Sequence, residues 1–242
     1  MPTTTGACLN AIGILLGALI GLARETPLSL RTQLLVRNTI GLANFLLGVR
    51  LIYLSIGGTV LSSLKQIFIA MLAVVVGFWL GKLLRFQKMS NYLGRLAGNA
   101  IVAAQKTPGQ NASDGFNACA ILFCAAPLGL IGAVTDGLSG YFYLLAVKAV
   151  MDAMAMTGFV RLFRWPSALS AIPVFVFFSA ICMAAQFHVA PYLSAPGLNS
   201  VNAAAGLLAC IITIVIFEVR KVALANYLPA LVIAPLLTKL FN

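Results

Sequence analysis

Residues 8–23 read CLNAIGILLGALIGLA, an apolar run without a charged side chain. A helix needs roughly 20 mainly apolar residues to cross the hydrocarbon core of a bilayer. Seven more runs of this kind follow, at residues 38–56, 65–83, 115–135, 140–161, 168–187, 201–219 and 222–240. The pattern predicts an all-α, polytopic transmembrane protein with about eight spans.

The composition agrees with a membrane location. Of the 242 residues, 61% are hydrophobic and only 9% are charged, and the mean hydropathy is +1.01. A soluble domain carries about 25% charged residues, and a chain this short would still have a large surface to cover with polar groups. Lipid is the solvent in which so apolar a surface is stable, so we expect the lipid bilayer as a partner.

The net charge of +11 would suggest nucleic-acid binding in a soluble protein. Here the basic residues lie between apolar runs, where they set the orientation of membrane proteins, and we expect no nucleic-acid partner. The connections after the first, third, fifth and seventh runs carry most of them: Arg24, Arg31, Arg37, Lys82, Arg85, Lys88, Arg95, Lys106, Arg161, Arg164, Arg220 and Lys221. We therefore predict that these connections are cytoplasmic and that both termini lie outside, in a bacterial inner membrane.

The first six runs show signs of an internal duplication. Asn10-Ala11 recurs as Asn117-Ala118, and Val49-Arg50-Leu51 resembles Val160-Arg161-Leu162, in the same order and at a nearly constant offset. A unit of three spans forces its second copy to insert upside down, and inverted repeats are typical of transporters. The expected organisation is one transmembrane domain with repeat one at about 8–83, a connection at 84–114, repeat two at about 115–187 and a C-terminal hairpin at 201–240.

The connection at 84–114 holds most of the polar residues. Its first part combines Arg85, Lys88 and Arg95 with apolar residues, a pattern typical of a segment that lies along the membrane surface. Its second part, residues 106–114, is predicted to be a solvated loop.

Several short motifs occur in a recognisable order along nearly the whole chain. They include Leu9-Asn10-Ala11, Gly132-Ala-Val-Thr-Asp136-Gly137, Lys148-Ala-Val-Met-Asp152 and Val222-Ala-Leu-Ala-Asn226-Tyr-Leu-Pro229. Together they resemble the YdfK/YqgA-like family of bacterial inner-membrane proteins, the domain of unknown function 554 family. The chain departs from that pattern after Pro173, where Phe178-Ser179-Ala180 stands in place of a polar Gln-Gly step. The resemblance implies a location and a helical fold rather than an activity.

Lys148 and Asp152 are the clearest candidates for a functional site. They are four residues apart in one apolar run, so they share a helix face and can pair directly. Each charge near the middle of a membrane costs roughly 2.5–3.5 kcal/mol, and such residues usually face a cavity or a partner. The pair could bind or gate a charged solute, or Asp152 could take up a coupling proton or cation. Alternatively, the pair only locks its helix against its neighbours.

Other polar residues inside apolar runs are weaker candidates for binding an ion or solute. Asn10, Asn117 and Asn226 carry amides that could coordinate a solute or form interhelical hydrogen bonds. Asn226 also precedes Pro229, which predicts a kinked or partly re-entrant last segment. Pro127 offers a similar break in the run at 115–135. Asp136, followed by Gly137, could attract cations at a pore mouth or simply form a turn.

Gly13, Gly17 and Gly21 form two successive GxxxG motifs in the first run. Such a ladder is a close-packing face, and its partner is either another helix of the chain or a second copy in a homo-oligomer.

These features favour a membrane transporter or channel for an ion or small polar solute, with its site at the repeat interface. A structural or regulatory membrane protein that moves nothing is the alternative. One histidine and five acidic residues leave little for acid–base catalysis, so we do not expect an enzyme. The five cysteines have no metal-ligand spacing, and no metal or cofactor is expected.

Overall fold

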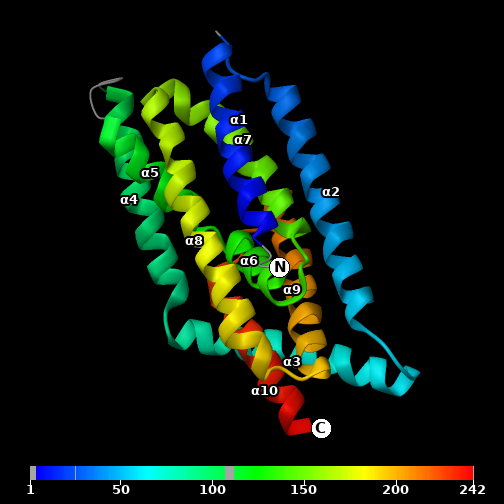
Figure 1. Cartoon of the computed structure of the whole chain (residues 1–242). Helices are drawn as coiled ribbons and strands as arrows, with labels where there is room; N and C mark the ends of the chain where they lie inside the picture. The colour runs from blue at the N-terminus through cyan, green and yellow to red at the C-terminus, as the bar shows by residue number, and fades with distance from the viewer. Residues whose placement is uncertain (1–3, 25, 107–111, 242) are drawn as a thin grey trace.

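The apolar runs form helices, and no strand occurs among residues 4–24, 26–106 and 112–241, which the computed structural model describes. The main helices are α1 (Thr5–Ala23), α2 (Leu30–Ser55), α3 (Val60–Leu83), α4 (Phe86–Lys106), α5 (Ala112–Ala125), α6 (Pro127–Ser139), α7 (Tyr143–Phe163), α8 (Ala171–Ala184), α9 (Ala195–Ile216) and α10 (Ala230–Phe241). Short helical turns complete the chain: η1 (Trp165–Ser170), η2 (Ala185–Val189), η3 (Ala190–Tyr192) and η4 (Leu224–Tyr227). Figure 1 shows their arrangement.

The prediction of about eight spans is confirmed by helix length and hydropathy. Seven helical segments in the described residues are long and apolar enough to cross a membrane, and one bent pair makes up to eight. The predicted fourth span is not continuous, because α5 and α6 meet at an angle of 60°. Pro127, the first residue of α6, cannot donate the hydrogen bond that would continue α5.

Large apolar side chains cover the outside of the molecule. Leu19, Trp79 and Val232 are each more than 60% exposed, at 64%, 63% and 66%. Water would not tolerate so much apolar surface, whereas hydrocarbon does. The exposed faces are therefore the lipid-contacting surface.

The interior consists of two apolar clusters that meet on α6 and α7. One cluster joins α2, α3, α9 and α10, and the other joins α1, α5 and α8. α6 contributes Leu128 to the first cluster and Ala133 to the second, and α7 contributes Leu144 and Leu145 in the same way. α6 and α7 thus form the seam of the molecule.

The glycine ladder of α1 packs against α7. A Cβ atom at Gly13, Gly17 or Gly21 would collide with the backbone of α7 around Ala149, Ala153 and Thr157, respectively. The packing interpretation is therefore right, and the partner helix belongs to the same chain. Because α7 covers the ladder, the ladder no longer supports a homo-oligomer.

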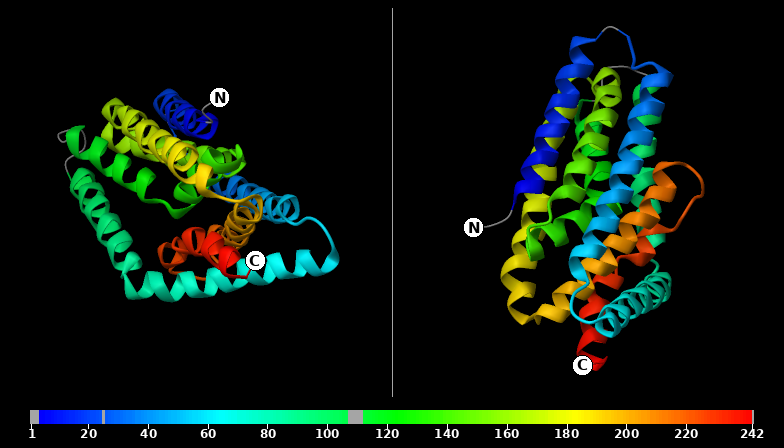
Figure 2. Two further views of the ribbon diagram at one scale, coloured as in Figure 1. Left: turned by 60° about the horizontal axis from the view of Figure 1, so that its bottom comes forward. Right: turned by 90° about the vertical axis from the view of Figure 1, so that its right-hand side faces the viewer.

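α3 and α4 run in different directions relative to the bundle. α4 runs beside α5 along the bundle, whereas α3 crosses one end of the bundle (Figures 1 and 2). Gly77 and Gly81 let α3 pass close to Ala230 and Asn226. α4 lies along the bundle because its Ala97 is buried in the second cluster. Relative to α1, α2 and α7, the transverse element is α3. The placement of the Arg85–Arg95 segment along the membrane surface stays a prediction.

This arrangement separates connections that were predicted to share one side. The α1–α2 and α7–α8 connections lie at one end of the bundle, and the α3–α4 junction lies at the other (Figure 1). The predicted solvated loop falls largely on residues 107–111, outside the described residues. The charge pattern therefore groups Arg24 with Arg161 correctly but not with Arg85.

The C-terminal hairpin is present, with α9 packed on α10. The hydroxyls of Thr238 and Ser200 join the two helices at 2.6 Å. The predicted break in the last segment is also confirmed, since η4 ends before Pro229 and α10 begins after it. The inverted repeat stays a hypothesis. α1 of the first predicted unit packs mainly on α7 of the second unit, whereas α2 of the first unit packs mainly on α9, which lies outside both units.

Candidate solute-binding site

Lys148 and Asp152 form a buried ion pair in the middle of α7. The Nζ atom of Lys148 lies 2.5 Å from Oδ2 of Asp152, and the two residues are 1% and 6% exposed. Their i,i+4 spacing places both on the side of α7 that faces α5, α6 and α8. The predicted pairing is therefore confirmed, and the pair carries no net charge.

Two aromatic rings surround the Lys148 ammonium group. Its Nζ atom lies 5.7 Å from the ring centroid of Phe123 on α5 and 5.3 Å from that of Phe178 on α8. Electron-rich ring faces attract a cation, most strongly where water is excluded. The rings therefore attract the ammonium group without supplying a second anion beside the Asp152 carboxylate.

Gly129 on α6 makes room for the Lys148 side chain. A Cβ atom at this position would lie 2.6 Å from Cε of Lys148 and would also collide with the Phe178 ring. Phe123 belongs to the last turn of α5, whose C-terminal end carries the negative pole of the helix dipole. The break between α5 and α6 thus forms one wall of the site.

Asn10 of α1 completes the site on the Asp152 side. Its side chain is fully buried and lies beside the Asp152 carboxylate, in position to donate to it. However, neither amide atom forms a hydrogen bond of standard geometry. A buried amide left so loosely bonded is uncommon in a structure. Asn10 therefore keeps hydrogen-bonding capacity next to the ion pair.

Asp136 has a different role from either prediction. It lies within α6 and is fully buried, and the following turn is at Gly140, with φ +69°. Its Oδ2 accepts a hydrogen bond of 2.9 Å from the Gly6 amide in the first turn of α1. A carboxylate is stabilising at a helix N-terminus, so Asp136 anchors α1 to α6. It forms no turn and does not line an aqueous mouth.

Asn117 and Asn226 do not join the pair. Asn117 lies on an exposed face of α5. The backbone N–H of Gln87 donates to Oδ1 of Asn226 at 3.0 Å. In return, the backbone N–H of Ala225 donates to Oε1 of Gln87 at 3.2 Å. Asn226 therefore holds η4 against the first turn of α4. Of the predicted binding residues, the structure brings together Lys148, Asp152 and Asn10.

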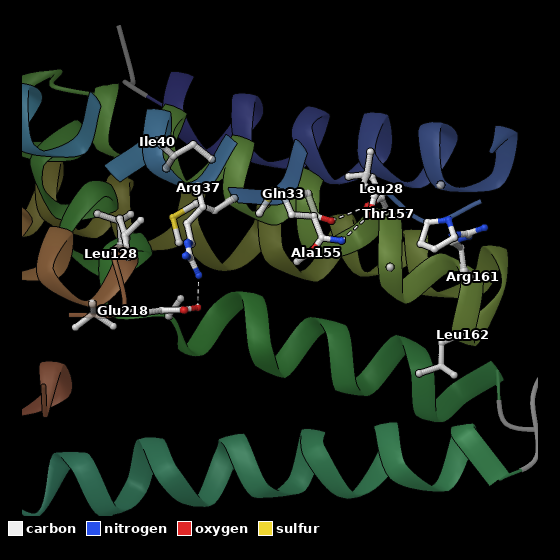
Figure 3. A pocket seen from close by; sticks show the side chains of 18 of the residues that line it. Leu28, Gln33, Arg37, Ile40, Leu128, Ala155, Thr157, Arg161, Leu162 and Glu218 are labelled. Atoms are coloured by element: carbon white, nitrogen blue, oxygen red, sulfur yellow. Dashed lines mark hydrogen bonds and ion pairs between the residues drawn. The ribbon is translucent and has the colours of Figure 1, made fainter. Parts of the chain in front are cut away.

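A cavity of about 960 Å³ lies on one side of α6, near the α1–α2 connection (Figure 3). On this side the cavity is lined by Ala126, Pro127 and Leu128, which lie at the break between α5 and α6. The charged residues that line it are Arg24, Arg37, Arg161 and Glu218. Arg37 Nη1 and Glu218 Oε1 are 2.5 Å apart, so the carboxylate among the described lining residues is already paired.

A second cavity of about 980 Å³ lies on the other side, between α6, the α8–α9 connection and α10. α6 lines it with Leu130, Val134 and Leu138, and its basic lining residues are His188 and Lys239. The α1–α2 and α8–α9 connections are at opposite ends of the bundle (Figure 1). The two cavities therefore approach α6 from opposite ends.

α6 separates the two cavities beside the ion pair. Leu128 lines the first cavity and Leu130 the second, and Gly129 between them contacts Lys148. Sequence reasoning missed Phe123, Phe178 and Gly129, because no spacing rule connects aromatic residues on different helices to one lysine. Of the features that form this side of the site, the sequence predicted only the helix break at Pro127.

Among the described residues, no group of three His, Cys, Asp or Glu side chains could hold a metal ion. The site offers instead a cation, an anion, an amide and two aromatic rings. Such a set can bind a small charged or polar solute and can exchange a proton.

Comparison with known proteins gives a family but no activity. The family model described as "Protein of unknown function (DUF554)" matches residues 5–239. "Uncharacterized protein YqgA" of Escherichia coli (strain K12) is 24% identical over 230 residues, covering 95% of this chain and 94% of the relative. "Uncharacterized membrane protein YdfK" of Bacillus subtilis (strain 168) is 24% identical over 234 residues, covering 95% and 93%. No solved structure matches the chain. Because the family model spans nearly its whole length, this membrane protein belongs to the DUF554 family.

Proposed function

We propose that the protein is a transporter or channel for a small ion or polar solute, with Lys148 and Asp152 as its central binding residues. One observation carries this proposal: the buried, charge-neutral pair lies at the helix break that separates two cavities. Ionisable residues inside a membrane are costly and usually belong to solute or proton pathways. Broken helices beside a central site are a recurring device of transporters.

The predicted inverted repeat would supply the movement. If the units at 8–83 and 115–187 rock against each other, α6 alternately opens toward one cavity and the other. Since the two relatives described above come from bacteria, we also propose the bacterial inner membrane as the location. We also propose that the protein is not an enzyme, since one histidine and five acidic residues leave little for acid–base catalysis.

Flux through proteoliposomes tests the proposal. The purified full-length chain is reconstituted, and uptake of a panel of ions and small metabolites is measured against protein-free vesicles. Lys148→Ala and Asp152→Asn should each abolish gradient-driven uptake, because each removes one half of the neutral pair. Lys88→Ala and Asp114→Asn change the same residue types outside the site and should leave uptake unchanged.

A single variant could also fail to fold, since an unpaired buried charge destabilises a protein by about 3–5 kcal/mol. The double variant Lys148→Gln/Asp152→Asn leaves no unpaired charge at the site and should fold, as judged by monodisperse gel filtration and thermal stability in detergent. It should show no uptake. Normal uptake by the folded double variant would refute the proposed site and would favour a purely structural role for the pair.

A further inference from the structure

We infer that the transported solute is a small anion, and that it crosses together with one proton carried by Asp152. This inference rests on the proposed function and adds the substrate class and the coupling ion. It is carried by the charges that line both cavities and by the neutrality of the buried pair.

Carboxylates for a cation path are scarce in this chain. The sequence has five acidic residues, and four of them lie in the described part. Asp152 pairs with Lys148, Glu218 pairs with Arg37, and Asp136 accepts from the Gly6 amide. Asp114, in the first turn of α5, lines neither cavity. A cation entering either cavity would therefore meet no uncommitted carboxylate among the described residues.

The first cavity presents positive charge along its length. Figure 3 shows Arg161 toward one end of it and Arg37 further along, beside Leu128 and Glu218. The Nε atom of Arg37 is shielded from solvent and has no hydrogen-bond acceptor. A guanidinium group binds carboxylates, phosphates and similar anions through such donors. Apolar walls strengthen the attraction, because they focus the field of the charges.

The break adds a further positive pole. The wall of this cavity at Pro127 and Leu128 is the N-terminal turn of α6, and Ala126 before it provides no side-chain cap. A helix N-terminus attracts anions through its dipole. In α6 the dipole is the main contribution, because Pro127 has no N–H and the Gly129 amide donates to the Ala126 carbonyl at 3.0 Å. The second cavity likewise has basic lining residues, His188 and Lys239, and no acidic residue in its described lining. Both approaches to α6 thus favour an anion.

Electroneutrality then requires a proton. In the resting site, the charge of Lys148 is balanced by Asp152 at 2.5 Å. If an anion replaces Asp152 at the ammonium group, a carboxylate without a counter-ion would be left in an apolar interior, which is strongly unfavourable. A proton on Asp152 restores neutrality: the anion balances Lys148, and the carboxyl group is neutral. One proton therefore accompanies each monovalent anion.

The groups around Asp152 are compatible with this exchange. α1 presents the uncharged Asn10 amide, which can hydrogen-bond to either form of the carboxyl group. α5 presents the Cys124 thiol, a titratable group within electrostatic range of the pair. α6 and α8 present Gly129 and the Phe178 ring. No second cation among these groups would hold Asp152 ionised once Lys148 binds the solute.

The experiment follows lumenal pH in proteoliposomes that contain the full-length chain. Chloride, nitrate and inorganic phosphate are the probes, each applied as an inward gradient, with a trapped pH-sensitive dye as the readout. We expect the lumen to acidify for at least one anion, with one proton per monovalent charge. Sodium or potassium gradients at constant anion concentration should produce no acidification.

Variants separate the two halves of the inference. Asp152→Asn should stop proton movement but retain exchange of labelled anion between the two sides, because it mimics the protonated state. Lys148→Gln should lose both activities. If Asp152→Asn still moves protons with the anion, or loses anion exchange while remaining folded, the proton-carrier role is overturned.

The entry residues give effects of opposite sign. Arg37→Gln should raise the KM for the anion by about tenfold, the effect of one lost charge-assisted hydrogen bond. Glu218→Gln should lower the KM, because it frees the Arg37 guanidinium. Arg220→Gln removes an exposed charge that does not line the cavity and serves as the control. A lower KM in Arg37→Gln, or no change in either variant, would overturn the anion path.

Failure of this inference can be told from failure of the proposed function. Uptake of a cation that depends on Lys148 and Asp152 would overturn the anion inference and leave the transporter proposal standing. Uptake of no probe, or uptake that the double variant retains, would refute both.

Discussion

Lys148 is among the largest side chains buried to below 2% exposure in the described residues. Its burial depends on small features of other helices: Gly129 leaves space for its methylene groups, and Phe123 and Phe178 face its ammonium group. Asp152 supplies the opposite charge. A buried lysine is stable in this position only because each of these neighbours is present. The site is therefore a set of residues that depend on one another, and not a single charge that the fold happens to accommodate.

Gly129 tests this dependence at the scale of one residue. Gly129→Ala should displace the Lys148 side chain, because the added Cβ would lie 2.6 Å from its Cε atom. Overpacking of this kind costs about 1–3 kcal/mol, measurable as a lower thermal midpoint in detergent, and uptake should fall as well. Gly98→Ala, on α4 where a Cβ meets nothing within 4 Å, should be neutral. Equal stability of the two variants would contradict the packing described at Lys148.

At the scale of elements, α1 and α7 form the most extensively packed helix pair among the described residues. The ladder of Gly13, Gly17 and Gly21 brings their backbones together, and Asp136 of α6 holds the N-terminal turn of α1. Interfaces of small residues are typical of membrane helices, where association depends on close van der Waals contact rather than on exclusion of water. This pair places Asn10 beside Asp152, so packing and site geometry are linked.

A bulky residue in the ladder should separate these helices. Gly17→Leu would place its side chain against the backbone of Ala153, and we expect loss of the folded protein or a thermal midpoint lowered by more than that of any single surface variant. Gly94→Leu, on α4 with open space around it, is the matched control. A stable Gly17→Leu protein would show that α1 does not pack on α7 through this face.

At the scale of the whole molecule, two apolar clusters meet at α6 and α7, and each of the two cavities borders this seam. Arg24, Arg37 and Arg161 come from different elements but line one cavity near one end of the bundle. The Arg161 side chain donates to the Arg24 carbonyl at 3.4 Å, which confirms that these two connections are neighbours. By the positive-inside rule, this end should face the cytoplasm.

Orientation can be measured with reporters fused to the C-terminus. α10 ends at the opposite end of the bundle from the α1–α2 connection (Figure 1). If that connection is cytoplasmic, a C-terminal alkaline phosphatase fusion should be active and a C-terminal green fluorescent protein fusion should be dark. The reverse pattern would show that the arginine-lined cavity opens to the outside.

The sequence by itself determined the membrane class, the approximate number of spans, the helix breaks at Pro127 and Pro229, and the pairing of Lys148 with Asp152. These follow from rules that act within one segment: hydrocarbon thickness sets helix length, proline removes a hydrogen bond, and i,i+4 spacing defines a face. The resemblance of short ordered motifs also identified the family.

Only the tertiary structure decided which helices meet. It showed that α7 covers the glycine ladder, that α3 rather than α4 is transverse, that Asn226 holds α4 while Asn10 joins the pair, and that two cavities flank α6. The reason is physical. Membrane helices present similar apolar surfaces to lipid and to one another, so their sequences contain little information about the partner. Shape complementarity, which exists only in three dimensions, makes that choice.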